Sequence, residues 1–139
     1  MQWLYNGTQV TEIDEKYISF VYLITNLTTN RKYIGKKKLK FTKTKQKNGK
    51  KKKVKVKSDW ETYYGSCKEL IEDVAKFGEQ NFKREILMFC LSTGMASYEE
   101  ARLQFENRVL ENPELWYNKY ISCRIHPNHI KKENDETPQ

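Results

Sequence analysis

The chain has 139 residues, which is enough for a single domain with a sizeable core. No run approaches the roughly 18 to 20 apolar residues of a membrane span, and the N-terminus lacks a basic-then-apolar signal pattern, so we expect an intracellular protein with no membrane partner. An odd number of widely spaced cysteines is typical of reduced packing residues in a reducing compartment. These are Cys67, Cys90 and Cys123.

The net charge of +8 is concentrated in one segment. Residues 36–57 contain 13 of the 26 basic residues, all of them lysines, and no acidic residue. The rest of the chain carries the other 13 against 18 acidic residues and is mildly acidic. A cationic patch this dense indicates a polyanionic partner, and the alternative is a solvated lysine run without one.

The pattern before this segment predicts two β-hairpins. The first pairs residues 3–5 with 8–10 across Asn6-Gly7, a strong two-residue turn signal. Residues 20–24 are continuously apolar, as in a central strand with both faces covered, and strand character returns at 31–34 after a turn-rich stretch. This second hairpin carries Tyr22 and Tyr33 on adjacent strands and stops at Gly35, where the backbone can turn sharply or approach a ligand closely.

The lysine-rich segment predicts a third hairpin, because residues 38–45 and 53–57 alternate with a period of two around Asn48-Gly49. We expect Leu39, Phe41, Val54 and Val56 on one face and lysines on the other, in an arm that lies along a groove of duplex DNA. An isolated hairpin is marginal in water, so the arm is expected to be mobile until bound. The lysines expected to contact phosphates are Lys38, Lys40, Lys43, Lys45, Lys53, Lys55 and Lys57.

A helix is predicted from Ser66 to Gly78, because Ser66 and Glu69 form a capping box and an apolar stripe follows. Ser66 is interpreted first as this cap and, alternatively, as a DNA contact. Tyr64 lies at the helix entrance and is expected either to contact DNA near the scissile phosphate or to pack on the sheet.

A third core strand is predicted over residues 81–90, followed by a second helix that a capping box opens at Ser97 and that ends near Asn112. On this helix Glu106 falls within the apolar arc, between Val109 and Leu110. A carboxylate there needs a partner, which is either Arg102 one turn earlier or a divalent cation.

Several of these residues together resemble the GIY-YIG nuclease family, in particular small bacteriophage-type members. The resemblance covers about residues 20–121 and includes a Trp-x-x-Tyr-Tyr-Gly-Ser stretch at 60–66. Its first motif departs from the family, because Phe20-Val21-Tyr22 stands where Gly-Ile-Tyr is common. The matching residues are Tyr22, Tyr33-Ile34-Gly35 with Lys36 after it, Glu106, and Asn118 twelve residues later.

The resemblance implies a metal-dependent endonuclease that hydrolyses phosphodiester bonds of double-stranded DNA. Tyr33 or Tyr22 would act as general base, with Lys36 lowering the tyrosine pKa. Glu106 would hold a single Mg²⁺ (or Mn²⁺) ion, and Asn118 would orient the site or the strand loop. The protein would be a monomer or a homodimer, in the host cytoplasm if it is phage-encoded, and homing, restriction, repair and DNA degradation stay open as roles.

One departure affects the chemistry. The family places an arginine about ten residues after the second tyrosine, on the first helix, where this chain has Lys43 in the basic hairpin. A cation would come from Lys36, Lys38 or Lys43, or the site is impaired, since lysine lacks the bidentate fork of arginine. The alternative function is therefore a non-catalytic nucleic-acid-binding protein on a degenerate nuclease scaffold, with an RNA-binding protein as a third possibility.

The expected fold is a compact α+β domain with a three-stranded antiparallel sheet flanked by helices. The predicted organisation is an N-terminal hairpin extension over residues 1–19, a nuclease domain over 20–121 with the basic hairpin inserted at 37–57, and a tail over 122–139.

Overall fold

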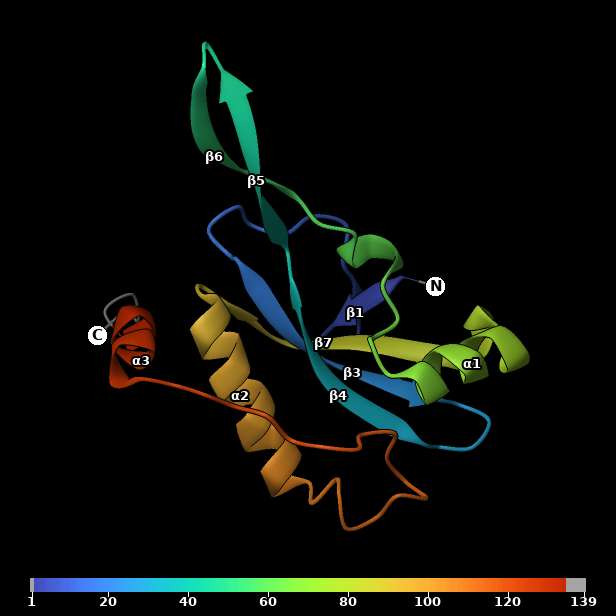
Figure 1. Cartoon of the computed structure of the whole chain (residues 1–139). Coiled ribbons are helices and arrows are strands. Elements are labelled where there is room, and N and C mark those ends of the chain that lie inside the picture. Colours follow the sequence, from blue (N-terminus) through green and yellow to red (C-terminus); the bar gives the residue numbers. More distant parts are fainter. Residues whose placement is uncertain (1, 135–139) are drawn as a thin grey trace.

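The structure is a computed structural model that describes residues 2–134. Its body is one five-stranded sheet in the order β2-β1-β7-β3-β4 (Figure 1). The three antiparallel strands at β7, β3 and β4 confirm the predicted α+β core. The N-terminal hairpin adds β1 parallel to β7, which makes the sheet mixed. The bounds are β1 Trp3–Tyr5, β2 Thr8–Gln9, β3 Ser19–Asn26, β4 Lys32–Lys38 and β7 Phe82–Cys90.

The central strand β3 has both faces covered, as its apolar run predicts. Phe20, Tyr22 and Ile24 point into a core with Leu70 of α1 (Lys68–Phe77), whereas Val21 points into a second core with α2 (Thr93–Glu106). Successive side chains of a strand face opposite sides of a sheet, so α1 and α2 lie on opposite layers (Figure 1). Short 3-10 helices lie at Trp60–Thr62 and Glu79–Asn81.

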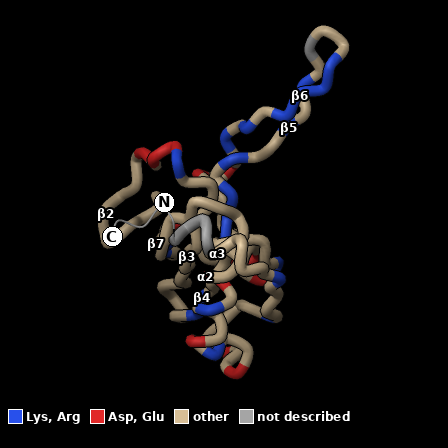
Figure 2. The backbone as a smooth tube through the Cα atoms, turned by 90° about the vertical axis from the view of Figure 1, so that its left-hand side faces the viewer, with Lys and Arg blue, Asp and Glu red and all other residues tan. Residues whose placement is uncertain are grey.

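The lysine-rich segment forms an arm of its own, β5 (Lys40–Lys47) paired with β6 (Lys50–Lys57), which projects from the body (Figures 1 and 2). Its turn is confirmed at Asn48-Gly49, with φ of 53° and 74°, as a type I′ turn requires. Two details of the prediction were wrong. Leu39 is buried in the body at the root of the arm, and lysines occupy both faces, since Lys43 lies opposite Val54.

Both helices begin at residues other than those predicted. Helix α1 starts at Lys68 after Cys67, and Ser66 lies outside it without capping it. Helix α2 starts at Thr93, because the hydroxyl of Ser92 accepts a hydrogen bond from the backbone N–H of Met95 at 3.1 Å. It ends at Glu106 rather than near residue 112. Ser92 caps the helix five residues before Ser97, where the sequence predicts the capping box.

The outer edge of β4 is covered by a later segment of the chain. The backbone N–H of Lys32 donates to the carbonyl of Leu115, and the N–H of Tyr117 donates to the carbonyl of Lys32, each at 2.8 Å. Tyr117 is fully buried, and its hydroxyl donates to Asp73 of α1 at 2.6 Å and accepts from Asn26 at 3.1 Å. Residues 115–118 are thereby fixed between the sheet and α1.

The described residues end in α3 (Pro127–Asn134), which lies within the predicted tail. The last five residues of the predicted tail, 135–139, lie outside the described residues. Among the helices of the described chain, none has the length and apolar character needed to cross a membrane.

Candidate active site

The two tyrosines of the central hairpin lie on the same face of the sheet. Tyr22 stands opposite Gly35 and Tyr33 stands opposite Ile24 in the β3–β4 register, so the tyrosines are diagonal neighbours with ring centroids 6.1 Å apart. Gly35 allows this arrangement because a β-carbon there would overlap the Tyr22 hydroxyl and lie 2.8 Å from the Tyr33 ring. The close approach predicted at Gly35 is therefore made by the side chains of Tyr22 and Tyr33 to the Gly35 backbone.

The tyrosines line a pocket of about 460 Å³ at the edge of β4, where the α1 layer and the α2 layer meet. Lys36 and Asn118 line the same pocket, so the structure brings four of the five predicted catalytic residues together. Side chains from α1, α2 and the segment that covers β4 complete it. The other lining residues are Ser66, Cys67, Lys68, Glu100, Gln104, Lys119, Tyr120 and Ser122.

The carboxylate of this pocket belongs to Glu100. It is half-buried on α2, close to the ammonium group and the backbone N–H of Lys36. Burial raises the pKa of Glu100, and the positive charge of Lys36 only partly opposes this. A half-buried carboxylate with a raised pKa, in a pocket with three lysines, is a candidate cation ligand.

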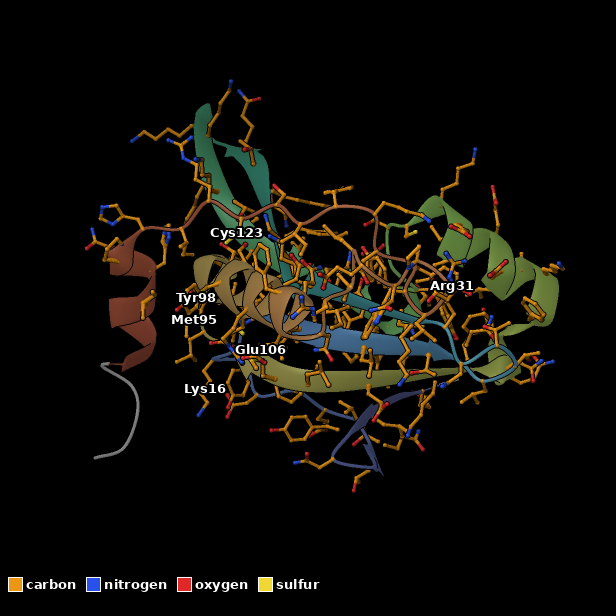
Figure 3. All side chains as sticks on the ribbon, turned by 90° about the horizontal axis from the view of Figure 1, so that it is seen from below. Lys16, Arg31, Met95, Tyr98, Glu106 and Cys123 are labelled. Carbon is orange, nitrogen blue, oxygen red and sulfur yellow. The ribbon has the colours of Figure 1, made fainter. Side chains whose placement is uncertain are left out.

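Glu106 lies outside the pocket, which corrects its predicted placement in the apolar arc of the helix. It is the last residue of α2, its side chain is 56% exposed, and its carboxylate pairs with Arg102 at 2.7 Å (Figure 3). The buried face of α2 carries Ala96, Ala101 and Gln104 instead. Of the two partners that the sequence suggests for Glu106, the structure contains the ion pair with Arg102.

The predicted effect of Lys36 on the tyrosine pKa stays a prediction. The Lys36 ammonium group donates to the hydroxyl of Ser97. Burial raises the pKa of Tyr33 to about 12, against the effect of a hydrogen bond with Ser66. Burial also raises the pKa of Tyr22 well above its ordinary value, and Glu100 raises both. The protein alone therefore keeps both phenols protonated at neutral pH.

Asn118 holds the strand that carries Tyr33. Its side-chain oxygen accepts from the backbone N–H of Ile34 at 3.1 Å, and its amide donates to the Ile34 carbonyl at 2.8 Å. Gln104 of α2 donates to the same carbonyl at 3.0 Å. These amides continue the pairing of residues 115–117 along β4, so the geometry supports the predicted orienting role for Asn118.

The other predicted contacts lie in three places. Ser66 lines the pocket beside Tyr33, whereas Tyr64 packs under the guanidinium group of Arg84, 4.2 Å from its ring centroid, and does not line the pocket. This arrangement favours the packing alternative for Tyr64. Six of the predicted lysines, Lys40, Lys43, Lys45, Lys53, Lys55 and Lys57, lie on the arm, and Lys38 ends β4.

Comparison with known proteins identifies the family. Residues 3–121 match the family model described as "Putative endonuclease segE, GIY-YIG domain". The chain belongs to the GIY-YIG family. Family membership indicates a nuclease, a hydrolase of phosphodiester bonds. Neither the curated proteins nor the solved structures contain a match to the chain.

The GIY-YIG pocket contains no arginine among its lining residues, but it contains a lysine on the first helix. Lys68 is the first residue of α1 and its side chain is 91% exposed. Arg31 is turned away from the pocket, because it pairs with Glu69 and lies 4.3 Å from the centroid of the Tyr117 ring (Figure 3). Lys68 could not be found by counting from Tyr33, since the arm separates the two residues in the sequence.

The donor set of this GIY-YIG pocket fits a single divalent cation. No group of three histidine, cysteine, aspartate or glutamate side chains lies close enough to hold a metal ion anywhere in residues 2–134. Mg²⁺ does not require such a cage, because it keeps several waters and is bound by one or two carboxylates together with substrate phosphates. Glu100 supplies one carboxylate beside open pocket volume.

Replacing Gly35 by alanine is expected to displace the Tyr22 hydroxyl, because the new β-carbon would occupy its position. Overpacking of this kind costs about 1–3 kcal/mol of unfolding free energy. We expect a lower midpoint in urea and a greater loss of cleavage than this destabilisation explains. Gly35 does not have a positive φ, so the overlap with Tyr22 is the expected source of the effect. A Gly35→Ala protein with the wild-type urea midpoint and wild-type cleavage would contradict the steric account.

Proposed function

We propose that the protein is a metal-dependent DNA endonuclease whose active site is the pocket between Tyr33 and Glu100. The observation that carries this proposal is the position of one half-buried carboxylate in the same pocket as the buried Tyr22 and the half-buried Tyr33, with lysines around them. Hydrolysis of a phosphodiester requires an activated water, relief of negative charge in the transition state and stabilisation of the leaving oxygen. The pocket offers a group for each requirement.

Glu100 would hold the Mg²⁺ or Mn²⁺ ion. The ion supplies Lewis-acid stabilisation of charge on the phosphate and on the leaving oxygen. The charge and the backbone N–H of Lys36 both favour the ionised form of Glu100. The raised pKa of this carboxyl group reflects its burial, and a cation in the pocket would favour its ionised form.

Tyr33 would accept the proton of the attacking water. Its ring is only half-buried, whereas Tyr22 is 1% exposed, so Tyr33 is the more accessible phenol. Tyr22 would help to position Tyr33, because the Tyr22 hydroxyl occupies the space beside Gly35, next to the Tyr33 ring. Asn118 and Gln104 hold the backbone at Ile34 and thereby fix where Tyr33 points.

Lys68 and Lys119 would bind the phosphates on either side of the scissile bond. Both line the pocket and both side chains are more than half exposed. Lys68 would occupy the role of the family's arginine as a point charge, without bidentate hydrogen bonds. The alternative function, a protein that binds nucleic acid without cleaving it, rests on this replacement of arginine by lysine.

Nicking of supercoiled plasmid tests the proposal directly. We expect conversion to the open-circular form with Mg²⁺ or Mn²⁺ and none with EDTA. All reactions use the same protein preparation. A contaminating nuclease that needs no metal would be recognised because it would also nick the plasmid in EDTA. Binding of duplex DNA without cleavage in any divalent metal would contradict the nuclease and support the binding-only alternative.

The arm is proposed to grip the DNA backbone. If about six of its lysines meet phosphates, the affinity for duplex DNA should fall about a thousandfold between 50 and 200 mM salt, because each contact releases condensed counterions. Fluorescence anisotropy with a labelled duplex at several salt concentrations measures this slope. A slope near zero would exclude the arm as a phosphate-binding element.

A further inference from the structure

The arm has two chemically different faces, which the strand register defines. Residues that are directly opposite in β5 and β6 share a face, as Thr42 does with Lys55 and Thr44 does with Lys53. The face that contains these pairs is called here the mixed face. Its distal part consists of Thr42, Thr44 and Gln46 on β5 and Lys51, Lys53 and Lys55 on β6.

The mixed face is divided along its length between its two strands. The β5 side presents two hydroxyls and an amide, all uncharged hydrogen-bonding groups, and the β6 side presents an unbroken row of lysines at every second residue. The opposite face has no such division. It is apolar near the root at Phe41, Val54 and Val56, and it carries only lysines in the described side chains farther out.

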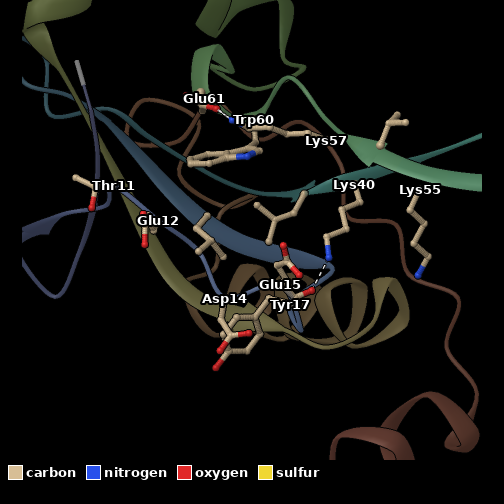
Figure 4. Close-up of a pocket in the computed structure, with 13 residues that line it drawn as sticks. Thr11, Glu12, Asp14, Glu15, Tyr17, Lys40, Lys55, Lys57, Trp60 and Glu61 are labelled. Atoms are coloured by element: carbon tan, nitrogen blue, oxygen red, sulfur yellow. Dashed lines mark hydrogen bonds and ion pairs between the residues drawn. The ribbon is translucent and has the colours of Figure 1, made fainter.

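The distal mixed face has no structural task inside the molecule. All six side chains are exposed, and in the described part of the chain none of them makes a side-chain hydrogen bond or an ion pair. The root of the arm is held separately. Lys40 donates to the carbonyl of Glu15, and Lys57 pairs with Glu61 (Figure 4). The six distal residues are therefore free to bind a ligand while the root stays attached.

The dimensions of the arm suit the major groove of B-form DNA. A two-stranded ribbon with strands about 4.8 Å apart fits a groove about 12 Å wide and 8.5 Å deep. Eight residues at about 3.3 Å each give an arm of roughly 26 Å, which is close to eight base-pair steps of DNA. The arm projects away from the body of the protein (Figure 2).

We propose that the arm inserts its mixed face into the major groove, where β5 reads base edges and β6 binds the phosphates of one strand. Gln46 offers the amide that pairs with the N6 and N7 edge of adenine, and Thr42 and Thr44 offer a hydroxyl and a methyl group that contacts thymine. Lysine contacts to phosphate position the ribbon without reading sequence. This inference rests on the proposed DNA substrate and adds that the arm determines sequence preference.

Selection from a random duplex library with the Glu100→Gln protein tests the inference by binding alone. The probe is a duplex of about 30 base pairs with a randomised centre, and bound molecules are sequenced after several rounds. We expect the selected pool to show a short preferred sequence. The triple substitution Thr42→Val, Thr44→Val and Gln46→Met keeps strand propensity and charge but removes the hydrogen-bonding groups. It is expected to lower the ratio of specific to non-specific affinity at least about tenfold.

The salt dependence of binding separates recognition of base edges by β5 from phosphate binding by the lysines of β6. The triple variant should keep the salt slope because it removes no charge, whereas Lys51→Gln, Lys53→Gln and Lys55→Gln together should lower the slope by about 2.7 and weaken binding to all sequences alike. The matched control is Thr8→Val with Gln9→Met on β2, an exposed strand away from the arm. This control is expected to select the same sequence as the parent protein.

Two outcomes would overturn the inference: a parent protein that selects no preferred sequence, and a triple variant that selects the same sequence as its parent. Both are measured without cleavage. A preferred sequence that disappears in the triple variant, together with no cleavage by the wild type in Mg²⁺, would support the reading face and contradict the proposed nuclease. The two proposals therefore fail separately.

Discussion

Replacing Glu100 by glutamine is expected to lower the rate of Mg²⁺-dependent cleavage about a thousandfold or more and to leave binding of duplex DNA in place. Glutamine has almost the same shape but carries no charge to hold a divalent cation. A bound metal ion contributes several kcal/mol of transition-state stabilisation, and each 1.4 kcal/mol corresponds to a factor of ten in rate. Single-turnover nicking of supercoiled plasmid, with anisotropy for binding, measures both quantities.

Glu106→Gln is the matched control, because it changes the same side chain on the same helix, about two turns further on. Its carboxylate is exposed and pairs with Arg102, and such surface pairs are worth at most about 1 kcal/mol. We expect cleavage within about twofold of the wild-type rate. If Glu106→Gln abolished cleavage and Glu100→Gln did not, the proposed metal ligand would be wrong and Glu106 at the end of α2 would take its place.

Replacing Tyr33 by phenylalanine is expected to reduce cleavage about 10²- to 10⁴-fold, the usual contribution of a general base. The substitution removes only the hydroxyl, so packing against Ile24 and Tyr22 is retained. Folding is checked by circular dichroism and by the urea midpoint, which should change little. A Tyr33→Phe protein with wild-type cleavage and an unchanged pH profile would remove Tyr33 from the mechanism.

The pH dependence of the wild-type rate provides a second test of Tyr33. Burial raises the pKa of its phenol to about 12, so the reactive phenolate is a fraction of about 10⁻⁵ at pH 7 and grows tenfold with each unit of pH below the pKa. Single-turnover cleavage should therefore rise with pH from about pH 7 to pH 9 without levelling. This rise should be absent from the residual activity of Tyr33→Phe.

On the acid side the loss of activity should be steeper. The pKa of the Glu100 carboxyl group is also raised by burial, and its protonated form does not bind a cation. As the pH falls, fewer molecules have Glu100 ionised and fewer have Tyr33 deprotonated, and the two losses multiply. A flat profile from about pH 5 to pH 9 would contradict both assignments.

The β-structure could be predicted because its signals are local. Asn6-Gly7 and Asn48-Gly49 need positive φ at both central residues of a two-residue turn, and few other dipeptides tolerate this. The apolar run of β3 predicts a strand covered on both sides, and two helix layers cover it. The two tyrosines on one face follow from the same hairpin register.

The helix that carries the carboxylate could not be placed correctly, because two serines compete for the cap. Ser97 with Glu100 satisfies the capping pattern, but Ser92 is the residue that accepts the hydrogen bond of the first turn. The apolar pattern of α2 does not resolve this, since Phe105 is exposed and Gln104 is buried against the backbone of Ile34. With the start misplaced, Glu100 was assigned to the cap and Glu106 to the core.

The segment that covers the edge of β4 places a condition on when the proposed site is assembled. Asn118 reaches the backbone of Ile34 across 84 positions of the chain, and Tyr117 closes the contact with α1. A chain that ends before these residues has the two tyrosines, Glu100 and the Gln104 contact to Ile34, but it lacks the Asn118 amide and the Tyr117 contact with α1. The proposed site is therefore assembled only once residue 118 has been made, and a cut in the exposed stretch before Leu115 is expected to loosen it.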